Sequence, residues 1–152
     1  MALRNSSGFL DRVQSLGVVR DGEENVDSSF QSVQSALRTA GFAVPNQPEN
    51  AAGTTPKVNV LMLPNAMENG MLETICLEAV SSDPVIQCID GYFECVSQTT
   101  SALPRPIEKA RVQAYLASRP SPGLLLGEAA DKGYWPWESP AFDHIKNFLR
   151  AL

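Results

Sequence analysis

The stretch LGVVRDGEEN, from Leu16 to Asn25, indicates how this chain begins to fold. Its first half is apolar and β-branched, which is typical of a short buried strand. Its second half places Asp21, Glu23 and Glu24 directly after that strand. Carboxylates crowded at the end of a strand indicate either a site for a cation or an acidic turn in water. These residues alone leave both interpretations open.

A helix and a second strand follow this stretch. The segment VDSSFQSVQSALRTAG, residues 26–41, repeats apolar residues at a spacing of three to four. Asp27 or Ser28 can cap this helix, and Gly41 suits the left-handed position beyond its end. KVNVLMLP, residues 57–64, is the second predicted strand. A strand, helix and strand of this length predict a right-handed parallel unit whose strands end at the same edge of the sheet.

That shared edge is where open parallel sheets bind their ligands. We therefore expect Asp21 and Glu23, after the first strand, to lie near the loop that begins at Asn65, after the second. Mg²⁺ prefers oxygen ligands, and a protein typically supplies it with one or two carboxylates. Asn65 and Glu73 would complete a magnesium site if the strands are parallel. The competing interpretation is a solvated acidic turn.

The remainder of the chain is mostly helical in pattern. Between the two strands, the long loop from Phe42 to Pro56 is rich in Pro, Asn and Gly, so it is either functional or mobile. The segment PGLLLGEAADKG, residues 122–133, is ambiguous between a short strand and a helix. The other predicted helices lie within residues 70–82, 83–98, 105–118 and 139–152.

Length and charge limit the classes of function. The 152 residues and 43% hydrophobic content predict one ordinary domain, residues 1–152, with its own core. The net charge is −5, from 17 acidic and 12 basic residues, so the overall field repels polyanions. Contact with a nucleic acid would need a local basic face or bridging metal ions.

The cysteines and the apolar runs indicate the compartment. Cys76, Cys88 and Cys95 are an odd number without CxxC spacing, which argues against a disulfide framework and a structural zinc, and we expect them reduced and buried. No segment has the apolar block of a signal peptide or the roughly 20 apolar residues of a membrane span. The sequence therefore predicts a cytoplasmic protein without membrane association.

One histidine and one aromatic group stand out near the C-terminus. His144 falls off the apolar stripe of the last predicted helix, so we expect it at the surface. With a single histidine, nucleophilic triads and histidine-rich zinc sites are poor hypotheses. Tyr134, Trp135 and Trp137 could stack on bases, but aromatics ahead of a capped helix usually pack back onto the core. We predict the packing role.

Several segments together resemble an uncharacterised prokaryotic family, domain of unknown function 3226, which belongs with Toprim-like proteins. The resemblance implies an α/β, Rossmann-like, largely parallel sheet flanked by helices. It also implies carboxylates that hold Mg²⁺ for phosphodiester chemistry, as in topoisomerases, primases and overcoming-lysogenization-defect nucleases. The segments that carry it are LGVVRDGEEN, FQSVQSALRTAGFAVP, VLMLPNAMENGMLETICLEAV and GYWPWESPAFDHIKNFLRAL, which cover nearly the whole chain.

Site residues transfer from this family position by position. Asp21 and Glu23 match the Toprim Asp-x-Asp at the end of a strand, and Glu73 matches the acidic residue after Gly-Met-Leu. Glu23 departs from the pattern because it replaces the second aspartate. A second departure is larger: Toprim domains have an earlier strand that ends in a catalytic glutamate, and no such strand precedes Leu16. We therefore expect a shortened version or a fragment.

The expected loss of that strand has two consequences. It removes the carboxylate that would move protons, so no catalytic residue is assigned. It also uncovers the edge of a neighbouring strand, which predicts pairing with a second copy as a homodimer. Two functions follow from the resemblance: a Mg²⁺-dependent nuclease-type enzyme acting on nucleic acid, and a catalytically lapsed, Toprim-like module that acts by protein interaction.

Overall fold

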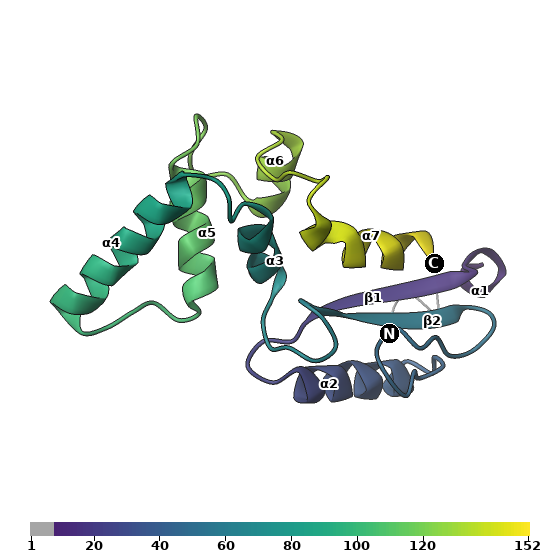
Figure 1. The fold of residues 1–152 in the computed structure, drawn as a ribbon. Helices are drawn as coiled ribbons and strands as arrows, with labels where there is room; N and C mark the ends of the chain where they lie inside the picture. Colours follow the sequence, from purple (N-terminus) through teal and green to yellow (C-terminus); the bar gives the residue numbers. More distant parts are fainter. Residues whose placement is uncertain (1–7) are drawn as a thin grey trace. The chain divides into compact units, whose positions relative to one another are not determined.

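The structure of the chain, a computed structural model, describes residues 8–152 (Figure 1). These residues form two compact units. Unit 1 extends up to Leu72 and includes the last stretch, Asp143–Leu152, whereas unit 2 is Glu73–Phe142. The organisation of residues 1–152 as a single Toprim-like domain stays a prediction.

Unit 1 is built on two parallel strands. Strand β1 (Ser15–Asp21) pairs with β2 (Lys57–Leu63), and the register runs from Ser15 opposite Lys57 to Asp21 opposite Leu63. The predicted parallel pairing and the common carboxyl edge are thereby confirmed. The described residues contain this two-stranded sheet and no third strand, so the α/β class holds with a smaller sheet than expected. A Toprim-like identity stays a prediction.

Two helices of unit 1 cover opposite faces of this sheet (Figure 1). Because side chains alternate along a strand, Val58, Val60 and Met62 of β2 face α2 (Val26–Thr39) and form a buried cluster with its apolar stripe. On the other face lies α7 (Asp143–Arg150). The buried side chains of the α2 stripe are Val26, Phe30, Val33 and Leu37.

Gly17 shows how closely the C-terminal segment approaches β1. A Cβ atom added at Gly17 would lie 2.6 Å from Leu152 Cδ1 and 3.2 Å from Phe148 Cε1. This strand position has no room for a side chain while Leu152 occupies its place. The last residues of the chain therefore seal the face of β1 that α2 does not cover.

The N-terminus of α2 corrects one prediction. Asn25, rather than Asp27 or Ser28, is the N-cap, and its Oδ1 accepts a hydrogen bond from the backbone N–H of Ser28 at 2.8 Å. Asn25 has the extended backbone that a cap needs, whereas Asp27 already lies in the first turn, where its charge favours the helix dipole. The helix ends as predicted, with Gly41 at a φ of 73°.

The long loop between α2 and β2 lies along the outer edge of β2. Ala52 and Val58 exchange two backbone hydrogen bonds of 2.9 and 2.8 Å, and the N–H of Glu49 donates to the carbonyl of Val60 at 2.8 Å. Pro45 is buried within the same loop. The sequence leaves a functional and a mobile role open for this loop. In the structure the loop covers the outer edge of β2 at Val58 and Val60.

Unit 2 is helical. The four helix predictions of the second half are confirmed, and the ambiguous segment at residues 122–133 contains a helix. In chain order the elements are α3 (Leu72–Ala79), which begins at the last residue of unit 1, α4 (Val85–Thr100), α5 (Ile107–Ala117), α6 (Leu126–Asp131) and the 3₁₀ turn η1 (Pro140–Phe142). Its largest fully buried side chains include Ile75, Leu116 and Phe142.

The aromatic segment of unit 2 packs against core residues, as predicted. Trp135 is buried, stacks on Tyr115 with ring centroids 5.3 Å apart, and donates its Nε1–H to the carbonyl of Leu126 at 3.2 Å. Tyr134 is half-buried. Trp137 is 49% exposed, and its ring centroid lies 4.7 Å from that of the buried Phe142, so it packs against the core with one side in solvent.

The prediction that the three cysteines are buried is wrong for two of them. Cys76 is buried, but Cys88 and Cys95 are exposed on α4, because seven residues separate them on a helix whose apolar side chains lie on another face.

A short helix, α1 (Phe9–Arg12), precedes β1. The expected absence of an earlier strand concerns residues 1–7 as well, and these lie outside the described residues. None of the helices among residues 8–152 is long and apolar enough to cross a membrane.

Candidate functional site

The carboxyl edge of the sheet is held together by backbone hydrogen bonds. Gly22 continues the ladder beyond β1 by donating its N–H to the carbonyl of Leu63 at 2.8 Å. The N–H of Glu23 donates to the carbonyl of Gly70 at 2.7 Å. A Cβ at Gly22 would lie 3.1 Å from the Leu63 oxygen and 3.2 Å from the Glu68 oxygen, so this close approach favours glycine. The acidic turn is therefore tied to the loop that leaves β2.

Asp21 is half-buried and holds the start of a helix. Its Oδ1 accepts a hydrogen bond from the backbone N–H of Leu72 at 2.9 Å. Leu72 is the first residue of α3, where N–H groups have no partner inside the helix and a negative charge favours the dipole. Asp21 thus acts as a capping group supplied from a distant strand. This gives the carboxylate a structural task.

Glu23 is engaged with a neighbouring cation. Its Oε1 lies 2.9 Å from Nη2 of Arg20, and about half of each side chain is exposed. Such a surface ion pair contributes roughly 0–1 kcal/mol to stability. Glu24 is exposed. The three carboxylates of the opening stretch therefore have three separate environments.

Asn65 forms the turn after β2. Its Oδ1 accepts hydrogen bonds from the N–H groups of Met67 and Glu68 at 2.9 and 3.0 Å, and its Nδ2 donates to Glu68 Oε2 at 2.7 Å. Sequence reasoning placed Asn65 at this edge correctly but missed Asn69, whose Oδ1 accepts from the N–H of Val26 at 3.0 Å. An Asn-rich turn after a strand is the signal that could have indicated this role.

Glu73 is the first residue of unit 2 and lies in the first turn of α3. Its charge and, more strongly, burial raise the pKa of Cys76 to about 12. The structure therefore places Asp21, Glu23 and Asn65 on segments that leave one edge of unit 1. Glu73 follows Leu72 along the chain in the other unit.

A Mg²⁺ site needs several oxygen ligands that surround one point. Among residues 8–152, no three His, Cys, Asp or Glu side chains converge so that they could hold a metal ion. One oxygen of Asp21 is occupied by the Leu72 N–H, and a cation at Glu23 would have to displace the guanidinium of Arg20. The carboxylates of Asp21 and Glu23 therefore each have another partner in this structure. The magnesium site stays a prediction.

The outer edge of β1 is a second candidate surface. In a parallel pair, alternate residues of each strand direct their N–H and C=O groups to the partner. Gln14 accepts from Lys57 and Gly22 donates to Leu63, so the even-numbered residues of β1 face β2. The odd-numbered residues face outward: Ser15, Gly17, Val19 and Asp21. Among the described residues no strand pairs with Ser15 to Asp21 on this side, and just beyond β1 an antiparallel bridge joins Glu23 to Gly70.

His144 joins the two sides of unit 1 and corrects the prediction of a surface residue. Its Nε2 lies 2.8 Å from Oε2 of Glu49, and its Nδ1 lies 3.3 Å from the carbonyl oxygen of Pro64. The ring is half-buried, with 31% of the side chain exposed. Because Glu49 belongs to the loop that covers β2, His144 connects α7 to that loop.

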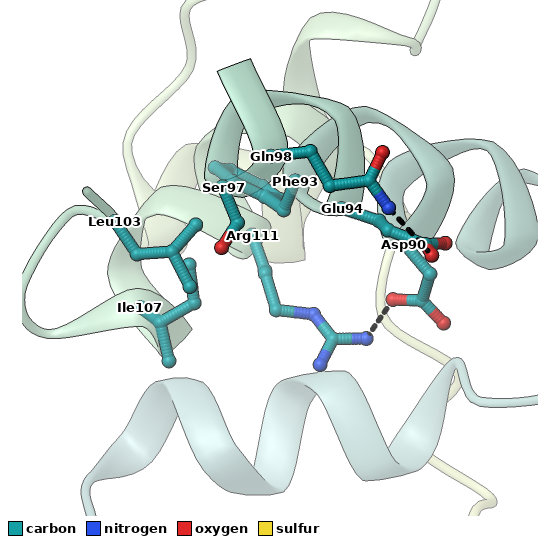
Figure 2. A pocket seen from close by; sticks show the side chains of 8 residues that line it. All are labelled: Asp90, Phe93, Glu94, Ser97, Gln98, Leu103, Ile107 and Arg111. Atoms are coloured by element: carbon teal, nitrogen blue, oxygen red, sulfur yellow. Dashed lines mark hydrogen bonds and ion pairs between the residues drawn. The ribbon is translucent and has the colours of Figure 1, made fainter. Parts of the chain in front are cut away.

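Unit 2 contains an open groove of about 430 Å³ between α4 and α5 (Figure 2). Phe93, Leu103 and Ile107 supply its apolar lining, and the ion pair between Arg111 and Asp90 lies toward one end. The lining includes neither His nor Cys. Its one arginine, Arg111, is paired with Asp90.

Comparison with known proteins identifies one family. A family model described as "Protein of unknown function (DUF3226)" matches residues 1–152. No curated protein and no solved structure showed a significant match to the chain.

Proposed function

Because the chain belongs to the DUF3226 family, whose function is unknown, we propose a function from its own geometry. It is a cytoplasmic, Toprim-like module without catalytic activity that acts by protein interaction through the outer edge of β1. The observation that carries the proposal is the contrast between two features of unit 1. Asp21 is engaged in capping α3 and Glu23 in a surface ion pair, whereas no strand among the described residues pairs with the outward backbone groups of β1.

The engaged carboxylates support the absence of catalysis. Asp21 caps α3 and Glu23 pairs with Arg20. A general acid or base must be free to reach the proton that it moves. The unpaired strand edge supports interaction because main-chain hydrogen bonds to an added strand are a common way of binding peptides and proteins.

Hydrogen exchange of single amides tests whether the edge is available. In dilute protein, we expect the N–H groups of Gly17 and Val19 to exchange rapidly, because they face outward from β1. Those of Leu16 and Val18 should exchange slowly, because they donate to β2 in this register. Equal protection along the strand would contradict the proposal, since it would mean that the edge is already covered.

A Mg²⁺-dependent nuclease acting on nucleic acid is the second candidate. One observation favours it: Asp21 and Glu23 lie at the carboxyl end of a parallel strand, the common ligand-binding edge of such sheets. If Mg²⁺ bound there, it would supply charge stabilisation to a transferring phosphate. Asp21, Glu23, Asn65 and Glu73 are the residues that would hold it.

A thermal titration separates the two candidates. Under our proposal, Mg²⁺ and Mn²⁺ leave the melting temperature of the wild type unchanged, and no nucleic acid is cleaved. A metal-dependent rise that Asp21→Asn abolishes, together with cleavage, would establish the nuclease instead.

Asp21 variants test the structural role of this carboxylate separately. Asp21→Asn keeps an acceptor for the Leu72 N–H, so we expect little loss of stability. Asp21→Ala leaves that N–H without its partner and should lower the free energy of unfolding by about 1–2 kcal/mol. Denaturant unfolding of both variants measures the difference. Equal stability of Asp21→Ala and the wild type would show that the capping bond contributes nothing.

A further inference from the structure

We propose that the strand which pairs with β1 is the β1 strand of a second copy of this chain, running antiparallel about a two-fold axis at Val18. This inference rests on the proposed interaction role of the β1 edge and names its partner. The result is one continuous sheet with the strand order β2, β1, β1, β2. Each copy contributes the same edge.

The two edges of the sheet are treated differently. The outer edge of β2 is closed by Ala52 and Glu49, which bond to Val58 and Val60. Natural proteins also protect free edges with Pro, Lys or a bulge. β1 reads SLGVVRD and contains neither Pro nor Lys, and its two charged residues, Arg20 and Asp21, stand together at its C-terminal end. Among the described residues, the stretch from Ser15 to Val19 has none of these protections, and such an edge beside a covered one is suited to pairing.

The register follows from which backbone groups face outward. In antiparallel pairing about Val18, Ser15 lies opposite Asp21 of the second copy, and Gly17 lies opposite its Val19. Every outward residue of the strand then meets another outward residue, as a hydrogen-bonded pair requires. Moving the axis to Gly17 or Val19 leaves at least one of these residues beyond the end of the partner strand. Pairing about Val18 therefore uses the edge completely.

The side chains agree with this register. Val19 is 48% exposed and would lie over Gly17 of the second copy, which has no side chain of its own. Leu152, 41% exposed, occupies the space next to Gly17, so an apolar surface is ready to cover Val19. On the other face, Arg20 lies opposite Leu16 and Val18 opposite itself. No two like charges are opposed, which would be destabilising.

A second copy would also enlarge the sheet. An isolated pair of strands is marginally stable, and here packing against α2 already supplies the stability that the pair needs. Pairing through β1 gives each copy a four-stranded sheet at no cost in new folding. Because one strand edge buries less surface than a standard interface of roughly 1,600 Å², we expect a concentration-dependent dimer rather than a permanent one.

Sedimentation of the full chain over a concentration series tests the dimer. We expect the wild type to pass from monomer to dimer. Val19→Lys places a charge on the edge and should raise the dissociation constant by about tenfold or more. Val19→Thr is the matched control because it keeps the β-branched shape and the backbone groups, so it should dimerise within about threefold of the wild type. Unchanged thermal unfolding in dilute solution shows that both variants are folded.

Cross-linking tests the register. Cys88→Ser and Cys95→Ser first remove the exposed natural thiols. In that background, Val18→Cys places two thiols opposite each other on the two-fold axis, where strand spacing of about 4.5 Å between Cα atoms permits a disulfide. Oxidised glutathione accepts the two electrons and two protons released as the S–S bond forms. Leu16→Cys lies opposite Arg20 instead and should not cross-link.

The outcomes distinguish this inference from the function on which it rests. Dimerisation that Val19→Lys weakens, with cross-linking at position 18 alone, supports it. A chain that stays monomeric at its highest soluble concentration overturns it, as does equal cross-linking at positions 16 and 18. A monomer whose outward β1 amides exchange rapidly overturns the dimer but leaves the interaction module. Metal-dependent cleavage would instead overturn the proposed function, whatever the oligomeric state.

Discussion

Cys76 illustrates what burial does to a single side chain in this chain. It is 3% exposed, and its pKa rises from 9.0 to about 12, first because burial disfavours the thiolate and second because Glu73 is nearby. The thiolate is the reactive form of cysteine. Cys88 and Cys95, by contrast, are exposed on α4. The three cysteines should therefore differ sharply in chemistry.

We predict that a thiol reagent at about pH 8 modifies Cys88 and Cys95 in the native chain and leaves Cys76 unmodified. Above a pH of about 9, the unfolded thiol releases its proton while the folded one keeps it. Stability should then fall as the pH rises from about 9 toward about 12. Mass spectrometry of the labelled sites checks the reactivity. Labelling of all three cysteines at one rate would contradict the burial of Cys76.

The residues of the candidate site show what local pattern can and cannot reveal. The position of Asp21 at the end of a strand followed from the apolar run before it. Its task did not, because the Leu72 N–H lies 51 residues away in the chain. The same holds for Asn69 with Val26, 43 residues apart, and for His144 with Pro64, 80 residues apart. Sequence spacing carries no record of such partners.

At the scale of elements, the N-cap of α2 gives a direct test of the structure. Asn25→Ala removes the acceptor of the Ser28 N–H and should lower the free energy of unfolding by about 1 kcal/mol. Asp27→Ala, at the position favoured by the sequence, should cost less, about 0.3–1 kcal/mol through the helix dipole. Denaturant unfolding of the two variants measures both values. A larger loss at Asp27 would place the cap where the sequence indicated.

The elements themselves were largely predictable. Both strands have continuous apolar runs, and α2 and α7 carry amphipathic stripes bounded by capping residues, so their periodicity indicates their type. The role of the loop from Phe42 to Pro56 was not predictable, since its contact with β2 uses backbone atoms that every residue possesses. The number of strands in the sheet could not be predicted from the sequence either, because paired and unpaired strands share the same apolar pattern.

At the scale of the whole molecule, each of the two units has buried residues of its own. Val60 lies in the cluster of unit 1, and both tryptophans of the chain, Trp135 and Trp137, lie in unit 2. The return of residues 143–152 to unit 1 could not be predicted from local pattern. A helix stripe indicates that a partner exists but does not indicate which sheet it covers.

We predict that Val60→Ala lowers the stability of unit 1 by about 2 kcal/mol through the cavity it leaves. Far-UV circular dichroism reports helices of both units, whereas tryptophan fluorescence reports unit 2. The variant should therefore shift part of the dichroism transition and leave the fluorescence transition in place. Coincident curves that move together would show that the two units unfold as one cooperative body.

The loop along β2 has a consequence for how far assembly can proceed. A strand that offers both sides to solvent can add neighbours without limit and grow into a fibre. Here Ala52 and Glu49 occupy the bonding positions of Val58 and the carbonyl of Val60 on one side of the sheet. In the proposed dimer a strand is added through β1, so the assembly is complete after a single step. The loop thereby prevents the addition of further strands at β2, which would lead to amyloid-like growth.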